Sequence, residues 1–331
     1  MHEVSAMNKM KKKKLLSQQV RGVFTIFGLL IVVFAGMCIY SESFRSVYNI
    51  TNMLTQCVPL ACVAMGQTIV IINGGIDLSV GSAISVCTCA AAKLLNTENP
   101  VQIFFGVIAV ILIGVLVGFI NGAGINILKV PPLITTLCTS TALSGVALWI
   151  LPIAGGKINK PFAKFVYQKY DIISNPLIIM FILFLILRTV LYHTRTGTAI
   201  YAVGKDRQIS KTMGINVKRA SIKAYVIAGL CAGITGMLLA CRMRVGDPTC
   251  GAVYSMDSIT AAVIGGTSMA GGVGLLSGTV AGAFLIGMLS NIMNNLAVNQ
   301  FVQYVLKGSL LIVAMVIYSI SNLLEVKRRE K

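Results

Sequence analysis

Long apolar segments, separated by short polar ones, run along nearly the whole chain. A helix needs about 20 apolar residues to cross the hydrocarbon core of a bilayer. Because the backbone must pair internally in lipid, and because the apolar runs do not alternate as barrel strands do, they predict membrane helices. Five stretches contain no Asp, Glu, Lys or Arg, and each can hold at least one such helix: 22–41, 46–76, 101–128, 130–156 and 258–306.

The pattern predicts an all-α integral membrane protein with about ten transmembrane helices. The apolar run that follows the N-terminal lysines is too long for the core of a signal peptide, so we expect it to be retained as the first span. The predicted spans are 22–41, 52–72, 79–95, 101–121, 133–152, 176–193, 224–241, 258–272, 275–295 and 302–320.

The basic residues between the spans predict their orientation, because cytoplasmic loops carry an excess of Lys and Arg. With a cytoplasmic N-terminus, the inside segments hold 18 Lys and Arg residues and the outside segments hold 7. We therefore expect a basic cytoplasmic arm at 1–21, a transmembrane domain at 22–320 and a basic cytoplasmic tail at 321–331. The other inside segments are 122–132 and 194–223, and the outside segments are 42–51, 153–175 and 242–257.

Composition supports a membrane protein and excludes a nucleic-acid-binding domain. Of the 331 residues, 56% are hydrophobic and only 11% are charged, whereas soluble domains carry about 25% charged residues. The basic residues that give the net charge of +18 lie between the hydrophobic spans and form no separate basic domain.

The cysteines are predicted to pack as buried residues and not to bind a metal. Cys87 and Cys89 are two residues apart, so on a helix they point in different directions and do not form a metal pair. We expect no metal site. Seven of the nine cysteines lie in apolar runs and resemble small buried hydrophobes, namely Cys38, Cys57, Cys62, Cys87, Cys89, Cys138 and Cys231.

A glycine-rich break separates the second and third predicted spans. Gly74 and Gly75, after Asn73, end the second span. Asp77, two residues before Ser79, is expected to cap the next helix by accepting backbone N–H bonds. Irregular backbone at membrane depth survives only against protein or water, so the break is also a candidate lining for an aqueous path.

A second break lies within the long C-terminal apolar block. Gly265, Gly266, Thr267 and Ser268 begin it, and three further glycines follow. Its likeness to the first break hints at an internal repeat, which is frequent in transporters.

Uncharged polar residues within the spans are candidates for contact with a polar solute. The alternative is that they hydrogen-bond neighbouring helices. These residues are Gln67, Asn121, Thr135, Thr136, Asn291, Asn294 and Asn295.

The longest inside segment, 194–223, predicts a short helix. Asp206 is placed to start it and Gly214 to end it. Ile209 and Met213 are four residues apart and so share one face, which suits docking into a groove of a partner. The alternative is a solvated basic loop that lies on anionic headgroups.

The sequence holds no motif for chemistry of its own. It contains no G-x-x-x-x-G-K-[ST] phosphate-binding loop, no Ser/His/Asp set and no intramembrane carboxylate cluster typical of a proton relay. We therefore expect neither an enzyme nor a bound cofactor.

Five segments make the chain resemble the ribose-type permeases of bacterial ABC sugar importers, in the branched-chain amino acid/ribose permease superfamily. The resemblance covers about residues 22–320. The segment 74–82, Gly-Gly-Ile-Asp-Leu-Ser-Val-Gly-Ser, is its specific signature, and the others are 130–134, 201–204, 214–217 and 264–268.

The resemblance implies a type II ABC importer permease in the bacterial inner membrane. It implies a second permease copy, identical or different, two cytoplasmic ATPase subunits that use ATP, and an external sugar-binding protein. Arg242 and Arg244 would meet acidic residues of that binding protein, or else pair with Asp247 or Asp257. Carried over by position, the coupling segment that contacts the ATPase is Gly204, Lys205, Asp206, Arg207, Ile209, Met213 and Gly214.

Other functions stay open on the sequence alone. The solute could be a monosaccharide, inositol, a furanosyl signalling molecule or a branched-chain amino acid. An ion-coupled secondary transporter or passive channel would need no ATPase. A membrane scaffold or sensor would bind a soluble partner through 194–223.

Overall fold

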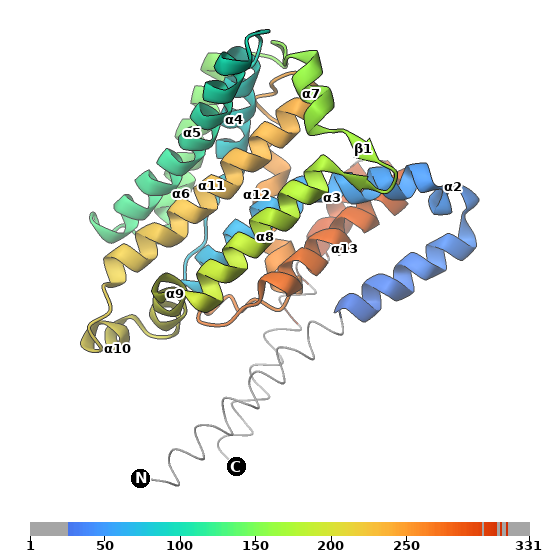
Figure 1. Cartoon of the computed structure of the whole chain (residues 1–331). Coiled ribbons are helices and arrows are strands. Elements are labelled where there is room, and N and C mark those ends of the chain that lie inside the picture. The colour runs from blue at the N-terminus through green and yellow to red at the C-terminus, as the bar shows by residue number, and fades with distance from the viewer. Residues whose placement is uncertain (1–25, 300, 310–311, 313–315, 317–331) are drawn as a thin grey trace, which may run out of the picture.

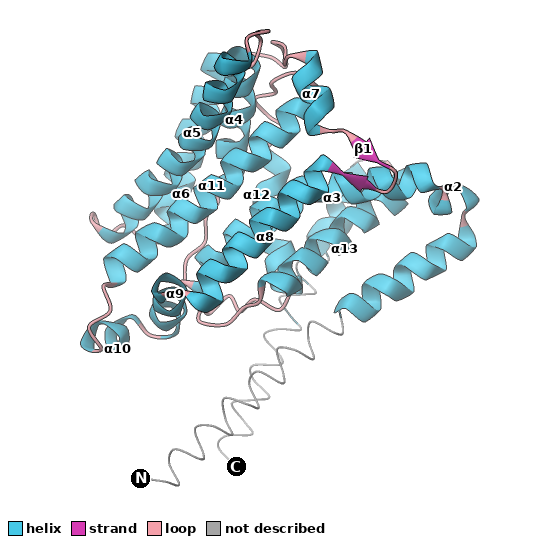
Figure 2. Cartoon of the chain, in the orientation of Figure 1, coloured by secondary structure: helices cyan, strands magenta, loops and turns pink. Residues whose placement is uncertain are grey.

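The computed structural model describes residues 26–299, 301–309, 312 and 316. The arm at 1–21, the tail at 321–331 and most of the second half of the span predicted at 302–320 lie outside the described residues. Helices dominate the described residues, whose strands form one short hairpin with two residues in each strand (Figures 1 and 2). The labelled elements are α2 (Glu42–Arg45), α3 (Val47–Ile72), α4 (Val80–Leu94), α5 (Pro100–Asn126), α6 (Pro132–Ile150), α7 (Lys160–Val166), β1 (Lys169–Tyr170), β2 (Ile173–Ser174), α8 (Asn175–His193), α9 (Arg195–Lys205), α10 (Arg207–Thr212), α11 (Val217–Met243), α12 (Ala252–Ile264) and α13 (Leu276–Asn295).

Helices occupy the described parts of the predicted spans, except for the end of the span predicted at 258–272. Six of them, α3, α5, α6, α8, α11 and α13, are long and apolar enough to cross a membrane, and three shorter apolar helices are Ile26–Tyr40, α4 and α12. A further helix runs over 301–309. The prediction of an all-α membrane protein is therefore confirmed.

One predicted span is wrong. The helix expected at 258–272 begins earlier and ends at Ile264, and residues 265–275 are not helical. Gly266, Gly271 and Gly272 have φ of 86°, 83° and 71°, a left-handed conformation that ends a right-handed helix. Apolar composition alone did not distinguish this turn from helix.

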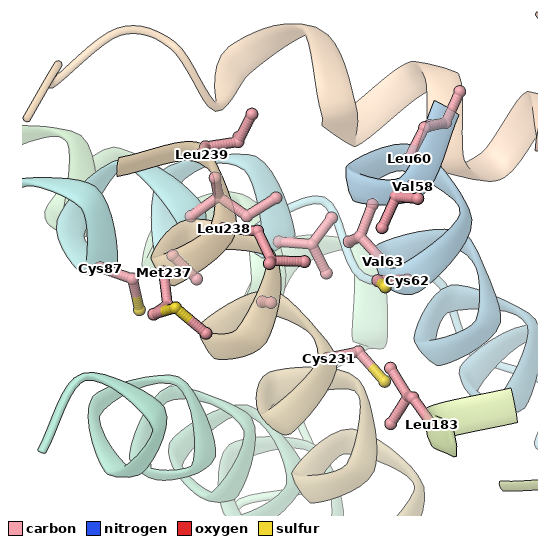
Figure 3. Packing of buried hydrophobic residues seen from close by; sticks show 14 of the residues in the cluster. Val58, Leu60, Cys62, Val63, Cys87, Leu183, Cys231, Met237, Leu238 and Leu239 are labelled. Atoms are coloured by element: carbon pink, nitrogen blue, oxygen red, sulfur yellow. The ribbon is translucent and has the colours of Figure 1, made fainter. Parts of the chain in front are cut away.

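The interior of the helix bundle includes buried polar residues, whereas its exterior is apolar. Within their apolar stretches, 94% of the residues of α3 and 78% of those of α11 are buried, against 28% in α5 and α8 and 11% in α6. The outer helices therefore present Leu, Ile and Phe outward, as lipid requires. The central packing draws on α3, α4, α8 and α11, and its labelled side chains are Val58, Leu60, Cys62, Val63, Cys87, Leu183, Cys231, Met237, Leu238 and Leu239 (Figure 3).

Close contact between α5 and α11 depends on glycine, which recurs at four-residue spacing at Gly114 and Gly118 of α5 and at Gly229 and Gly233 of α11. A Cβ at Gly114 would lie 2.3 Å from the Gly229 carbonyl oxygen, and one at Gly118 would lie 2.2 Å from that of Tyr225. Because lipid supplies no hydrophobic drive between helices, such backbone approach is a main source of helix association in membranes.

The nine cysteines all lie among the described residues and are free. Five of the seven expected in the core are buried, but Cys138 is exposed on α6 and Cys38 is partly exposed. The prediction was wrong for these two because an apolar run gives no sign of which face meets lipid. Outside the spans, burial raises the pKa of the Cys250 thiol to about 11, so this thiol stays protonated at neutral pH.

The segments predicted on the outside meet at one end of the molecule. Gly155 and Gly246 exchange backbone hydrogen bonds at 2.9 and 2.8 Å, and the Lys169 ammonium lies 5.4 Å from the centre of the Tyr48 ring. In Figure 1 this end carries α7 and β1, and the opposite end carries α9 and α10. The arrangement keeps 42–51, 153–175 and 242–257 together.

Candidate functional site

The first glycine break folds back along the helix that precedes it. Gly74 has a φ of 81°, and the Gly75 N–H donates to the Val70 carbonyl at 3.0 Å, which reverses the chain. With its amide oriented to satisfy both groups, the Gln67 side chain bonds the backbone N–H and C=O of Asp77, each at 3.2 Å. Since a helix rises 1.5 Å per residue, Gln67 lies about 7.5 Å before the end of α3, so the break folds back beside the last turns of that helix.

Asp77 is the centre of a buried hydrogen-bond cluster. Its carboxylate accepts from the Ser79 N–H at 2.9 Å and from the Ser79 hydroxyl at 2.7 Å. The Asn121 amide, on α5, donates to that hydroxyl at 2.7 Å and to the carboxylate at 3.5 Å. Asp77 accepts a backbone N–H at the start of α4, as expected, although Ser79 holds the N-cap position and its own side chain makes no cap bond.

Two buried polar atoms beside this cluster lack a hydrogen-bond partner. They are the Tyr225 hydroxyl, on α11, and the Asn121 side-chain oxygen. A Cβ at Gly75 would lie 2.3 Å from the Tyr225 hydroxyl, so glycine is what lets the break pass this ring. Buried unpaired polar groups are rare and call for a water or a functional explanation.

Helix α6 touches the first break through one threonine. The Thr136 hydroxyl donates to the Ile76 carbonyl at 3.3 Å, whereas that of Thr135 bonds carbonyls at the start of its own helix. Further along, the Ser82 hydroxyl lies 2.8 Å from that of Ser140. Of the two threonines predicted for the path, only Thr136 lies at the break.

The second break is a compact loop between α12 and α13. The Ser268 N–H donates to the Val273 carbonyl at 2.9 Å, which closes the loop. The neighbouring Thr267 is buried, and its hydroxyl has no partner. At Gly265 a Cβ would lie 2.6 Å from backbone atoms of Gly278, so glycine is needed where α12 passes α13.

The two breaks meet in space. The Gly272 N–H donates to the Ile72 carbonyl at 2.8 Å, at the end of α3. A Cβ at Gly271 would lie 3.0 Å from the Gly74 Cα. One turn or so into the flanking helices, the hydroxyls of Thr68 and Thr279 lie 2.6 Å apart. We call this meeting point the break junction.

Helix α9 packs directly on the break junction. At Gly204, a Cβ would lie 1.7 Å from the Ile72 carbonyl oxygen and 2.8 Å from the Gly272 nitrogen. The Tyr201 hydroxyl donates to the Gly274 carbonyl at 2.7 Å. Burial, and secondarily the neighbouring Tyr192, raises the pKa of Tyr201, so its phenol keeps the proton that it donates. The sequence indicated neither contact.

The predicted short helix is present as α10. The Asp206 carboxylate accepts from the N–H groups of Gln208 and Ile209 at 2.8 and 2.9 Å, and Gly214 ends the turn with a φ of 79°. Ile209 and Met213 are 55% and 75% exposed. Gly204 and Lys205 belong to α9, so the segment 204–214 spans two helices joined at Asp206.

The asparagines of α13 lie far from the break junction, at the helix end. Asn291 and Asn49, on α3, exchange amide hydrogen bonds at 3.2 and 3.1 Å. Asn295 donates to Asn291, and Gln303 donates to Asn294 at 2.9 Å. These amides link α3, α13 and the helix at 301–309. They therefore fit the alternative that polar residues in the spans hydrogen-bond neighbouring helices, and they do not line a break.

Arg242 and Arg244 line a groove of about 730 Å³ at the end that carries α7. Lys164 and Lys169 line the same groove. The two ion pairs among the described residues include neither arginine, so the expected alternative of pairing with Asp247 or Asp257 is wrong. Among the residues that the structure describes, no group of three His, Cys, Asp or Glu is placed to hold a metal.

A partly buried ion pair was not predicted from the sequence. The Lys307 ammonium lies 3.1 Å from the Asp257 carboxylate, and the two side chains are only 23% and 17% exposed. The pair joins α12 to the helix at 301–309. The charges stand 50 residues apart in sequence, and nothing local to either one indicates the other.

We expect Lys307→Met to destabilise the protein more than the double variant Lys307→Met/Asp257→Leu. Removing one partner leaves a charge unpaired in a poorly solvated site, which costs up to about 3 kcal/mol, whereas removing both does not. Thermal unfolding in detergent measures the difference. A double variant less stable than Lys307→Met would show that the charges do not interact.

Known proteins to which this chain is similar are described as permeases. Residues 49–315 match the family described as branched-chain amino acid transport system / permease component. The chain is 35% identical to the ribose import permease protein of Haemophilus influenzae over 294 residues, 87% of this chain and 90% of the relative. It is also 35% identical to that of Bacillus subtilis, over 88% and 90%. The galactose/methyl galactoside import permease protein of Haemophilus influenzae is 30% identical over 96% and 98%. No solved structure matches.

Proposed function

The chain belongs to the family of permease components of branched-chain amino acid transport systems, as a ribose-type sugar permease, and we propose that it is the membrane subunit of an ATP-driven importer for a monosaccharide. We place it in the bacterial plasma membrane with both termini in the cytoplasm. ATP hydrolysis would reside on separate cytoplasmic subunits, and an external protein would deliver the sugar.

The observation that carries this proposal is the break junction with α9 packed on it. Gly204 contacts the ends of both breaks, and one residue later α9 gives way to α10, whose apolar side chains are exposed. A partner that moves α10 therefore acts on a helix already in contact with Ile72 and Gly272. Irregular backbone of this kind is the part of a membrane protein that can rearrange around a solute.

The groups at the breaks suit a neutral polar solute. Asn121 and Thr267 each present an unpaired polar atom, and neither atom carries a charge. Hydroxyl and amide groups form the hydrogen bonds that a sugar offers, without the desolvation cost of a fixed charge. The printed names of the relatives, ribose and galactose permeases, support a monosaccharide as the cargo.

Reconstitution tests the proposed function. The complex that co-purifies with the tagged chain from its host, placed in liposomes with the external sugar-binding protein, should accumulate radiolabelled monosaccharide only when ATP is supplied to the ATPase side. The purified chain alone should give no uphill uptake. Accumulation by the chain alone, or uptake that an ionophore abolishes and ATP does not affect, would establish a secondary transporter instead.

We expect Met213→Glu to reduce association with the ATPase subunit about tenfold. The substitution places a charge in the exposed apolar face of α10, which would have to be desolvated in a protein groove. Co-purification of the ATPase with the tagged chain measures the effect. Thr198→Glu adds the same charge at an exposed position of α9, outside α10, and is the matched control. Equal retention of the ATPase by both variants would remove α10 from the docking surface.

A further inference from the structure

A basic groove lies on the other side of α10 from its exposed apolar face. It measures about 670 Å³ and runs between the turn that joins α5 to α6 and the turn that joins α10 to α11. Lys129 lines one wall, and Arg207, Lys211 and Lys218 line the other. No Asp or Glu lines it among the described residues. We call this the cationic groove.

The cationic groove is separate from the surface proposed for ATPase docking. The residues of α10 that line the groove are Arg207, Gln208 and Lys211, whereas Ile209 and Met213 are not part of its lining. Residues at i, i+1 and i+4 share one side of a helix, and the pair at i+2 and i+6 lies on another. The groove therefore stays open when a partner covers the apolar face.

The position of the groove puts it at the bilayer boundary. Asn126 ends α5, Pro132 begins α6 and Val217 begins α11, and all three residues line the groove. Its walls also include Ile125, Val130 and Ile215. A ligand that fits this lining has an anionic head beside four cations and an apolar portion between helix ends.

Lys129 indicates that the charge is not incidental to the turn. Its φ is 60°, a left-handed conformation that costs a lysine more than a glycine or asparagine. A turn selected only for its geometry would favour those residues. The lysine keeps a positive charge at the mouth of the groove in spite of that cost.

We propose that the cationic groove binds the phosphate headgroup of an anionic phospholipid of the inner leaflet. Basic pockets between transmembrane helices on the cytoplasmic side are the recurring sites for such headgroups. The inference rests on the proposed cytoplasmic placement of 194–223. The bound lipid would tie the start of α11 and the α5–α6 turn to α10, beside the coupling face.

Thermal unfolding of the purified full-length chain in neutral detergent tests this site. The probes are dioleoylphosphatidylglycerol and, as the zwitterionic reference, dioleoylphosphatidylcholine. We expect phosphatidylglycerol to raise Tm more than phosphatidylcholine does. In Lys129→Gln/Lys211→Gln, one charge from each wall is removed, and the difference should fall to less than half. The affinity for phosphatidylglycerol, measured from lipid adducts in native mass spectrometry, should fall about tenfold.

The matched control is Arg195→Gln/Arg219→Gln, which removes two exposed positive charges of the same segment outside the groove. It should keep the full response to phosphatidylglycerol. An equal loss in both variants, or none in the groove variant, would overturn the site. The same rise in Tm from inorganic phosphate would show a free-anion site. Loss of ATPase co-purification without loss of lipid binding would show a protein-docking groove. These readouts need no transport, so they fail independently of the proposed function.

Discussion

Gly204→Ala is expected to abolish sugar uptake. The added methyl group would lie 1.7 Å from the Ile72 carbonyl oxygen and 2.8 Å from the Gly272 nitrogen, and both are backbone atoms that cannot rotate away. Accommodating it requires α9 to separate from the break junction, which also breaks the hydrogen bond from Tyr201 to Gly274. Overpacking of this severity costs about 3 kcal/mol or more. Uptake in cells and Tm of the purified chain measure the two consequences.

Gly36→Ala is the control for this experiment. Gly36 is also helical, but a Cβ there would meet no atom within 4 Å. Alanine has the higher helix propensity, so this variant should be as stable as the parent and retain uptake. Uptake by Gly204→Ala within twofold of the parent, at matched membrane abundance, would show that α9 does not pack on the junction as described.

Gly75→Ala is expected to reduce uptake at least tenfold, and Tyr225→Phe to restore much of it. The nearest atom to the added methyl group is the Tyr225 hydroxyl at 2.3 Å, and the next ring atom is at 3.2 Å. The ring is fully buried. Removing its hydroxyl removes the severe overlap and leaves a contact that small shifts can absorb.

Tyr225→Phe alone separates packing from chemistry. Because the hydroxyl has no hydrogen-bond partner, its loss should leave the stability unchanged or slightly increased. Monosaccharide uptake by all three variants, corrected for membrane abundance, completes the cycle. If Tyr225→Phe alone lowers uptake as strongly as Gly75→Ala does, the hydroxyl acts on the solute and relief of overlap is not the explanation. Failure of the double variant to exceed Gly75→Ala would also contradict the overlap.

Much of the architecture could be predicted from the sequence, because lipid imposes simple rules on it. The uncharged runs located the membrane helices, and Gly74 and Gly75 located the end of α3. Asp206 and Gly214 located α10, because a capping carboxylate and a left-handed glycine act on neighbouring residues. These signals are local, so they can be recognised directly in the sequence.

The arrangement of the site depended on contacts that no local signal carries. The break at Gly265 is flanked by apolar residues on both sides, and composition extended its helix by eight residues beyond Ile264. Asn291, Asn294 and Asn295 resembled path residues, but at the far end of α13 Asn291 pairs with Asn49 of α3, Asn294 accepts from Gln303, and Asn295 donates to Asn291. Membrane depth and facing are properties of the packed bundle, and the same asparagine is possible in either role.

The sequence by itself determined a multi-pass helical membrane protein with two glycine-broken segments and a short helix with an exposed apolar face. Only the tertiary structure decided that the two breaks meet, that Gly204 is what holds α9 against them, and that Lys307 pairs with Asp257. The physical reason is distance along the chain. Hydropathy, caps and turns act over a few residues, whereas Ile72, Gly204 and Gly272 are brought together by the packing of helices that are far apart in sequence.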